Sequence, residues 1–169
     1  EYMAALSGEV YFAANDGING IELWKSDGTA AGTVLFADLQ AGGGSSGPRF
    51  LTEAGGKLYF QSSAFSGTQT GWEPWVSDGT VAGTFMLKDI RTGTSSSNAT
   101  GFIAMNGLVY FSATEDATGQ ELWVTDGTPS GTNLVVDTRP GTTGGLNSST
   151  ELVVMNNELF FASFTGGGN

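Results

Sequence analysis

The sequence predicts an all-β protein made of tandem four-stranded antiparallel units of about 50 residues. An eight-residue segment that runs from Glu through Trp to Asp-Gly-Thr occurs three times, beginning at Glu22, Glu73 and Glu121. Short apolar runs around Gly or Asn pairs, which are typical of β-hairpins, recur in step with this segment. The 169 residues include 27 glycines and only 4 prolines, and glycine and β-branched residues together interrupt every window in which a helix could form.

Each unit begins with a predicted hairpin. In the second unit two β-prone runs, residues 50–54 and 58–62, flank a Gly55-Gly56-Lys57 turn. Glycine and asparagine accept the positive φ angles that tight hairpin turns require. The equivalent turns of the other units contain Ser7-Gly8, Asn106-Gly107 and Asn156-Asn157. The second run of each hairpin is apolar on both faces, which predicts a strand that is covered on each side.

A third strand is predicted over residues 72–77 and a fourth over residues 85–89, with the Asp-Gly-Thr segment reversing the chain between them. Side chains alternate between the two faces of a strand, and an indole on one face suits the interface between neighbouring sheets. We therefore expect a core role for the three repeated tryptophans, Trp24, Trp75 and Trp123. Pro74 cannot donate a ladder hydrogen bond, so we expect that strand to be bulged there, or the amide position to face away from a partner.

Four strands followed by a Gly/Ser/Thr linker match one blade of a β-propeller. The alternative, a β-sandwich of ~100 residues per domain, does not explain a period of half that length. We predict a single array over residues 1–169, with units at 1–48, 49–100 and 101–150 and a final hairpin at 151–169. About four blades are the lower limit for closure. We therefore expect a partial or open propeller, which either belongs to a longer array or is completed head to tail by other copies.

Charge and composition exclude several classes of function. Six basic and 17 acidic residues give a net charge of −11, which repels nucleic acids and anionic lipid surfaces. No apolar stretch approaches ~20 residues, so no membrane insertion is expected. The absence of Cys and His removes thiol and zinc-thiolate chemistry and the usual general base. The glutamates of the repeated segments recur once per unit, which suits a structural position better than a unique active site, and we expect no enzyme activity.

The repeated segments resemble the bacterial ELWxxDGT repeat family, and the resemblance covers nearly the whole chain. It includes a later Gly-Thr pair (Gly32-Thr33, Gly83-Thr84 and Gly131-Thr132) and an Asp that closes each fourth strand (Asp38, Asp89 and Asp137). Pro74 replaces the signature Leu, a departure that does not touch the Asp-Gly-Thr turn. The resemblance implies a secreted or cell-surface protein with many tandem units and no catalytic residues. The turn is also similar to the Asp-box of other propellers, where it is generally structural.

Residue chemistry favours a structural role for these turns. A turn Asp accepts backbone N–H groups, Gly adopts a left-handed conformation, and Thr hydroxyls bond locally. The residues to which we assign this role are Asp27, Gly28, Thr29, Asp78, Gly79, Thr80, Asp126, Gly127 and Thr128.

We expect a non-catalytic extracellular or cell-surface module with a structural or adhesive role. Its partners would be copies of itself, other surface proteins or glycans, bound through variable loops on a fixed scaffold. One alternative is a carbohydrate-binding module, because Phe65 and Trp72 in the longest loop could stack on a sugar. Another is a calcium-binding module, because Asn15, Asp16 and Asn19 supply closely spaced oxygen ligands, although without the bidentate Glu of an EF-hand loop. No other cofactor is expected.

Asn98 and Asn147 each begin an Asn-x-Ser/Thr triplet in equivalent linkers between units. Such triplets are acceptor patterns for N-glycosylation, and polar chains also produce them by chance. We expect both asparagines to carry sugar only if the source organism glycosylates its surface proteins.

Overall fold

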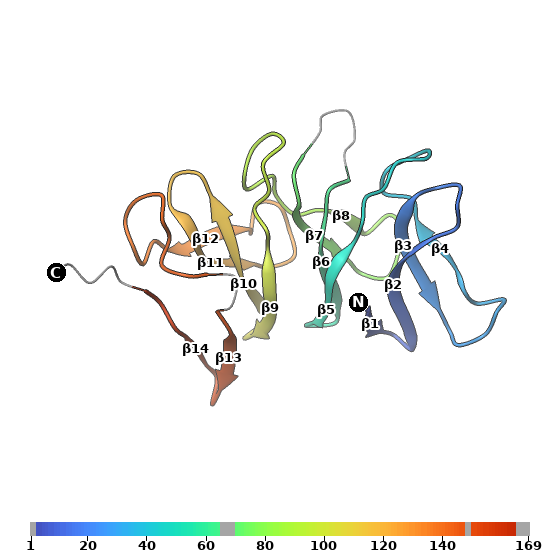
Figure 1. Cartoon of the computed structure of the whole chain (residues 1–169). Helices are drawn as coiled ribbons and strands as arrows, with labels where there is room; N and C mark the ends of the chain where they lie inside the picture. Colours follow the sequence, from blue (N-terminus) through green and yellow to red (C-terminus); the bar gives the residue numbers. More distant parts are fainter. Residues whose placement is uncertain (1–2, 65–69, 148–149, 165–169) are drawn as a thin grey trace.

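A computed structural model describes residues 3–64, 70–147 and 150–164 and confirms the all-β prediction. Three sheets have four antiparallel strands, a fourth has two, and the strands of every sheet are hydrogen-bonded in chain order (Figure 1). The first unit contains β1 (Met3–Leu6), β2 (Glu9–Asn15), β3 (Ile21–Ser26) and β4 (Val34–Ala37). The second contains β5 (Arg49–Ala54), β6 (Lys57–Ser62), β7 (Glu73–Ser77) and β8 (Thr84–Met86).

The third unit contains β9 (Thr100–Met105), β10 (Leu108–Glu115), β11 (Gly119–Thr125) and β12 (Asn133–Val136). A terminal hairpin follows, made of β13 (Leu152–Met155) and β14 (Glu158–Phe161). No helix formed by the described residues is long and apolar enough to cross a membrane.

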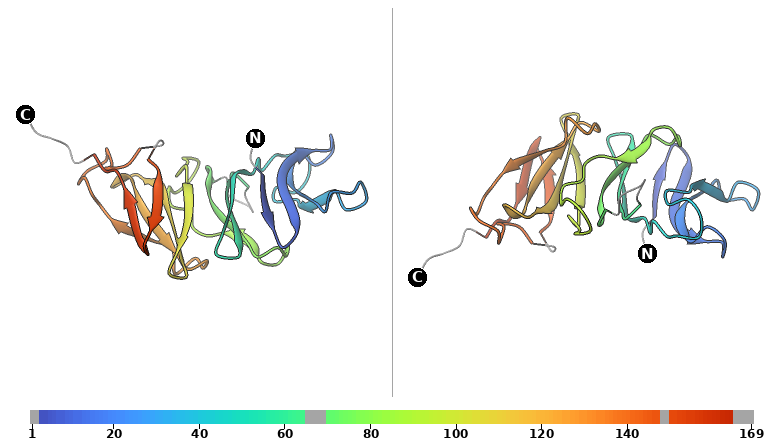
Figure 2. Two further views of the ribbon diagram at one scale, coloured as in Figure 1. Left: turned by 90° about the horizontal axis from the view of Figure 1, so that it is seen from below. Right: turned by 90° about the horizontal axis from the view of Figure 1, so that it is seen from above.

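The sheets follow one another in an open row and do not close into a ring (Figures 1 and 2). The first strands of successive units are neighbours, because contacts join β1 to β5, β5 to β9 and β9 to β13. Since each unit is an antiparallel meander, its hairpin turn and its Asp-Gly-Thr turn share one end of the sheet, which we name the turn end. The loops between the second and third strands lie with the linkers at the opposite end, the loop end.

The hairpin turns have the backbone geometry that their residues predict. Both central residues have positive φ in every hairpin: Ser7 and Gly8, Gly55 and Gly56, Asn106 and Gly107, and Asn156 and Asn157. Positive φ at both positions matches the right-handed twist of the flanking strands, and Gly and Asn adopt it most readily. The turns therefore set the register of all four hairpins, for example Ala54 opposite Lys57 in the second unit.

Pro74 shortens the ladder between the third and fourth strands of the second unit. In the first unit a bulge lies between Trp24 and Leu23, but the ladder continues beyond it, where Leu23 pairs with Ala37. In the second unit the pairing starts only at Trp75, and β8 has three residues where β4 has four. Proline has no amide hydrogen to donate, although the carbonyl of Pro74 accepts the N–H of Leu87 at 2.8 Å. The bulge expected at Pro74 is therefore absent from the ladder of β7 with β8, which instead ends early.

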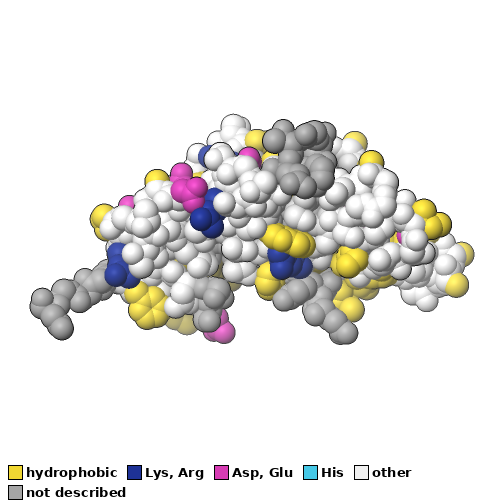
Figure 3. All heavy atoms as spheres, turned by 45° about the horizontal axis from the view of Figure 1, so that its top comes forward, with side chains coloured by type: hydrophobic (Ala, Val, Ile, Leu, Met, Phe, Trp, Pro, Cys, Tyr) yellow, Lys and Arg dark blue, Asp and Glu magenta, His cyan; other side chains and the backbone are white. Residues whose placement is uncertain are grey.

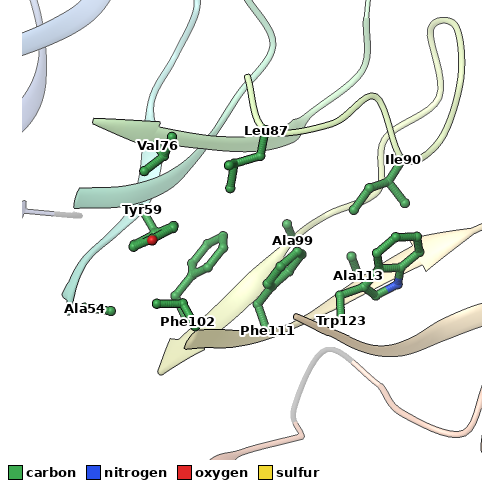
Figure 4. Close-up of a cluster of buried hydrophobic side chains, with 11 residues drawn as sticks. Ala54, Tyr59, Val76, Leu87, Ile90, Ala99, Phe102, Phe111, Ala113 and Trp123 are labelled. Atoms are coloured by element: carbon green, nitrogen blue, oxygen red, sulfur yellow. The ribbon is translucent and has the colours of Figure 1, made fainter. Parts of the chain in front are cut away.

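Two apolar clusters lie between neighbouring sheets. The first joins Tyr11 and Phe36 of the first unit to Leu58 and Phe60 of the second. The second joins the second and third units, and its side chains converge from the two sheets (Figure 4). Its ring contacts run from Tyr59 to Phe102 and on to Phe111, with centroids 5.6 and 5.1 Å apart. Each unit therefore buries its apolar faces against its neighbours, as in other repeat arrays.

Candidate functional site

Each Asp-Gly-Thr turn uses its carboxylate to hold its own backbone. In the second unit Asp78 Oδ1 accepts the N–H of Thr80 at 2.8 Å and its hydroxyl at 2.7 Å. The hydroxyl oxygen of Thr80 in turn accepts the N–H of Gly83 at 2.9 Å. The same bonds recur at Asp27 and Thr29 and at Asp126 and Thr128. These hydrogen bonds, above all the one from the threonine hydroxyl, hold the pKa of each Asp below its ordinary value.

Geometry requires glycine at two places in each turn. The glycine after Asp has a φ of +92° at Gly28, +90° at Gly79 and +88° at Gly127, a region that other residues rarely adopt. The later glycine lies against the Asp side chain. A Cβ on Gly32, Gly83 or Gly131 would overlap the carboxylate of Asp27, Asp78 or Asp126. The second Gly of the repeated pattern is therefore explained by a close approach within the turn.

The turns also contact the preceding unit. A Cβ built on Gly79 would lie 3.5 Å from the hydroxyl of Tyr11, and one on Gly127 would lie 3.3 Å from the hydroxyl of Tyr59. Burial raises the pKa of both tyrosines to about 12. The equivalent place at Gly28 has no atom within 4 Å. The tyrosines of β2 and β6 thus lie beside the turn of the following unit.

The glutamate of each repeated segment is completely buried and binds the linker that leads to the next unit. Glu73 accepts the N–H of Ile90 on one oxygen and the N–H of Ser97 on the other, both at 2.9 Å. Glu22 accepts the N–H groups of Leu39 and Ser46 in the same way. In the third unit Glu121 accepts the hydroxyl of Thr138 and the N–H of Gly145. Burial raises the pKa of Glu73 to about 7, although hydrogen bonds from Ser97 and Ile90 act in the opposite direction.

Sequence reasoning did not find this role of the glutamates. The signal was present, because the bonded residues follow each Glu at the same two separations, 17 and 24 positions. A serine stands at the second of these positions in two units, Ser46 and Ser97. These carboxylates are fully buried, and their oxygens accept hydrogen bonds from their own linkers.

The three tryptophans occupy equivalent positions but different environments. Trp123 is buried between the second and third units, and Trp75 is half-buried against the cluster between the first and second. Trp24 is half-buried on the outer face of the first sheet and belongs to neither cluster. The indole Nε1 atoms of all three are buried without a hydrogen-bond partner among the described residues. The burial of each tryptophan therefore depends on whether a neighbouring sheet covers the face on which it lies.

The candidate calcium ligands hold their own loop. Asn15 Oδ1 accepts the N–H of Gly17 at 2.7 Å, and Asp16 Oδ1 accepts the N–H groups of Ile18 and Asn19, both at 2.8 Å. The Asn19 side chain donates to the other Asp16 oxygen at 2.7 Å. These bonds, led by the one from the Asn19 backbone, lower the pKa of Asp16. In the described part of the chain no three His, Cys, Asp or Glu side chains are grouped to hold a metal ion. The loop geometry is therefore explained without a cation.

The remaining candidate residues lie at the loop end. Asn98 is exposed, with a φ of +52°, and Asn147 is exposed in the equivalent linker. The two residues that follow Asn147 in its triplet, and Phe65, lie outside the described residues. The ring of Trp72 is covered by the Arg49 guanidinium, whose carbon is 3.2 Å from the ring centroid. One face of the Trp72 ring is therefore occupied by the guanidinium, and the residue is half-buried.

The outer side of the first sheet exposes positions that are buried between units. We name it the head face, and it consists of Met3, Val10, Phe12, Trp24 and Leu35. Val10 is 39% exposed, whereas its counterparts Leu58 and Val109 are 0% and 4% exposed. In the second and third units this side packs against the preceding sheet. The head face therefore has the composition of half an internal interface.

The opposite side of the row has a complementary character. We name it the tail face, and it consists of Val135, Val136, Val153, Met155 and Phe160. Met155 is 55% exposed, whereas its counterparts Leu6 and Ala54 are 6% and 4% exposed. Phe160 occupies the position of the buried Tyr11 and Tyr59. The tail face therefore corresponds to the side of each unit that receives the next one.

Comparison of the chain with protein-family models, curated proteins and solved structures gave no match. The candidate function must therefore follow from the repeated turns, the buried glutamates and the two outer faces.

Proposed function

We propose that the chain is a non-catalytic repeat module that assembles head to tail, in the manner expected of ELWxxDGT-type arrays on a bacterial surface. The occupant of each outer face is a further unit of the same kind, supplied in solution by a second copy of the chain. One observation carries the proposal: equivalent positions are buried between units and exposed on the head and tail faces. Burial of exposed apolar surface is energetically favourable, and exposed apolar patches mark interaction sites.

The internal interfaces supply the docking geometry. In the second and third units, the side of the sheet that corresponds to the head face packs against the tyrosine-bearing side of the preceding sheet. These two contacts form the two apolar clusters. Contact between the head face of one copy and the tail face of another would continue the same packing. Such a contact is heterologous, so it adds copies without limit unless the rotation between them closes a ring. The buried glutamates support this role because they fix each linker and hence the spacing of successive units.

Sedimentation velocity over a range of concentrations tests the proposal. The unmodified chain should grow beyond a dimer as its concentration rises. A head variant, Met3→Glu with Val10→Glu, and a tail variant, Val153→Glu with Met155→Glu, should each remain monomeric because a charge is costly to bury at an apolar contact. All four residues are exposed, so the fold should tolerate the changes.

The matched control is Val81→Glu, which alters an exposed valine in an Asp-Gly-Thr turn, away from both faces. It should assemble like the unmodified chain. An unmodified chain that stays monomeric at every concentration, or face variants that assemble as well as the control, would refute the proposal.

A further inference from the structure

A pocket of about 280 Å³ with a mixed polar and apolar lining opens at the loop end, where the second unit meets the third. Its lining includes Arg49 and Gln61 from the second unit, Asn98 from the linker, and Thr100, Thr114 and Gln120 from the third. The chain therefore forms a concave site outside the Asp-Gly-Thr turns and outside the two apolar faces.

The repeat supplies an internal comparison for this pocket. Thr100 and Gln120 correspond to Arg49 and Trp72 in the second unit, where the guanidinium and the indole stack and occupy the space. Gln61 corresponds to Ala13 in the first unit and to Ser112 in the third. The scaffold thus folds with other residues at these positions. The pocket forms because its side chains differ from those at the equivalent positions of the other units.

Gln61 places an acceptor at the wall of the pocket. The residue is 1% exposed, and its Nε2 donates to the carbonyl of Ala99 at 2.7 Å. That bond orients the carboxamide, and its Oε1 has no hydrogen-bond partner among the described residues. A buried acceptor without a partner is costly, so buried polar groups in folded proteins are normally satisfied. A ligand hydroxyl would satisfy this one after a small movement of the pocket wall, because the Oε1 atom is closed to solvent in this structure.

Neighbouring groups hold the site in place. The Gln120 side chain donates to the hydroxyl of Ser112 at 2.7 Å, which fixes the second carboxamide. Phe50, which also lines the pocket, has a φ of +56° at an irregularity in the pairing of β5 with β6. Strained conformations at non-glycine residues occur preferentially at functional sites. The pocket is therefore a preformed site with fixed polar groups beside an aromatic ring.

The lining indicates the chemistry of the ligand. Carboxamides and hydroxyls can both donate and accept hydrogen bonds. Among the described residues of the lining, Arg49 carries the single charge and no carboxylate is present, despite the acidic composition of the chain. Figure 3, which shows the loop end obliquely, has only isolated charged side chains on a mainly uncharged surface. A molecule with many hydroxyl groups and one apolar face fits this mixture. We propose that the pocket binds one neutral pyranose residue of a glycan.

This inference does not depend on head-to-tail assembly, so the two proposals can fail separately. Saturation-transfer NMR observes the ligand and tolerates assemblies of any size. The unmodified chain is titrated with glucose, galactose, mannose and N-acetylglucosamine, and with glucuronate as an anionic comparison. At least one neutral sugar should show saturable transfer. Absence of saturable transfer from all four neutral sugars, or transfer from glucuronate alone, would overturn the proposal.

Two variants locate the binding. Gln61→Ala copies the first unit and removes the buried acceptor, so it should weaken binding about tenfold. Gln120→Trp copies the second unit and should abolish binding by filling the pocket. Gln40→Ala, which removes a carboxamide from the first linker, is the matched control and should bind like the unmodified chain. Undiminished binding by both pocket variants, with native circular dichroism, would show that the sugar binds elsewhere and would also overturn the proposal.

Discussion

Replacement of Glu73 by alanine should destabilise the second unit and release the linker that follows it. The substitution leaves the buried N–H of Ile90 without its acceptor. It also removes one of the two acceptors of the Ser97 N–H, which keeps its bond to the carbonyl of Trp72 at 3.1 Å. A buried donor without a partner costs about 1–3 kcal/mol, so the loss at Ile90 predicts a destabilisation of about that size. Single substitutions at the upper end of this range usually break a buried network.

Hydrogen exchange measured by NMR is the appropriate assay, because repeat arrays need not unfold in one cooperative step. In Glu73→Ala the amide of Ile90 should lose protection first, because the amide of Ser97 keeps its bond to the carbonyl of Trp72. Glu53→Ala is the matched control, since Glu53 lies in the same unit and accepts one exposed N–H, that of Gly56, at 2.8 Å. If both variants had the same denaturation midpoint, and the Ile90 amide stayed protected, the glutamate would not hold the linker and the reasoning would fail.

Three further predictions concern pH, the turns and salt. The folded chain favours the neutral form of Glu73, so this stabilisation is complete below the ordinary carboxyl pKa of 4.5 and is lost as pH rises through about 7. The unfolding midpoint should therefore fall between pH 5 and pH 8 by more in the unmodified chain than in Glu73→Gln; equal slopes would contradict this. Gly127→Ala should lower thermal stability more than Gly28→Ala, because only a Cβ on Gly127 would meet the preceding unit, at Lys57 and Tyr59, and equal losses would show that these contacts are unimportant. Head-to-tail association should strengthen between 50 mM and 300 mM salt in sedimentation, because salt screens repulsion between chains of charge −11; weaker association at high salt would indicate ionic contacts instead.

Much of the fold was predictable because its signals are local. Gly and Asn pairs mark the hairpin turns through their φ angles, and the alternation of apolar residues marks the strands. The buried glutamates were not recognised because their partners lie 17 and 24 residues later, in linkers of variable composition. A pattern of two-residue alternation places Glu73 on a face but does not show which backbone groups enclose it.

The pocket between the second and third units was also beyond prediction from sequence. Its residues are dispersed between Arg49 and Gln120 and converge only because two sheets pack side by side. The sequence indicated the loop end as variable, and it suggested Trp72 as a sugar-stacking residue. The structure instead places Arg49 over that ring, and the open space lies at the next junction, where Gln120 replaces the indole.

The central claim, head-to-tail assembly, is tested most directly by mixing the head variant with the tail variant. Each variant keeps one intact face, so a heterologous interface predicts that neither assembles alone. An equimolar mixture should form dimers and stop there, because every such dimer presents only two altered faces. Sedimentation velocity of the mixture should therefore show a single species of twice the monomer mass. A mixture that remains monomeric, or a single variant that dimerises by itself, would contradict the account.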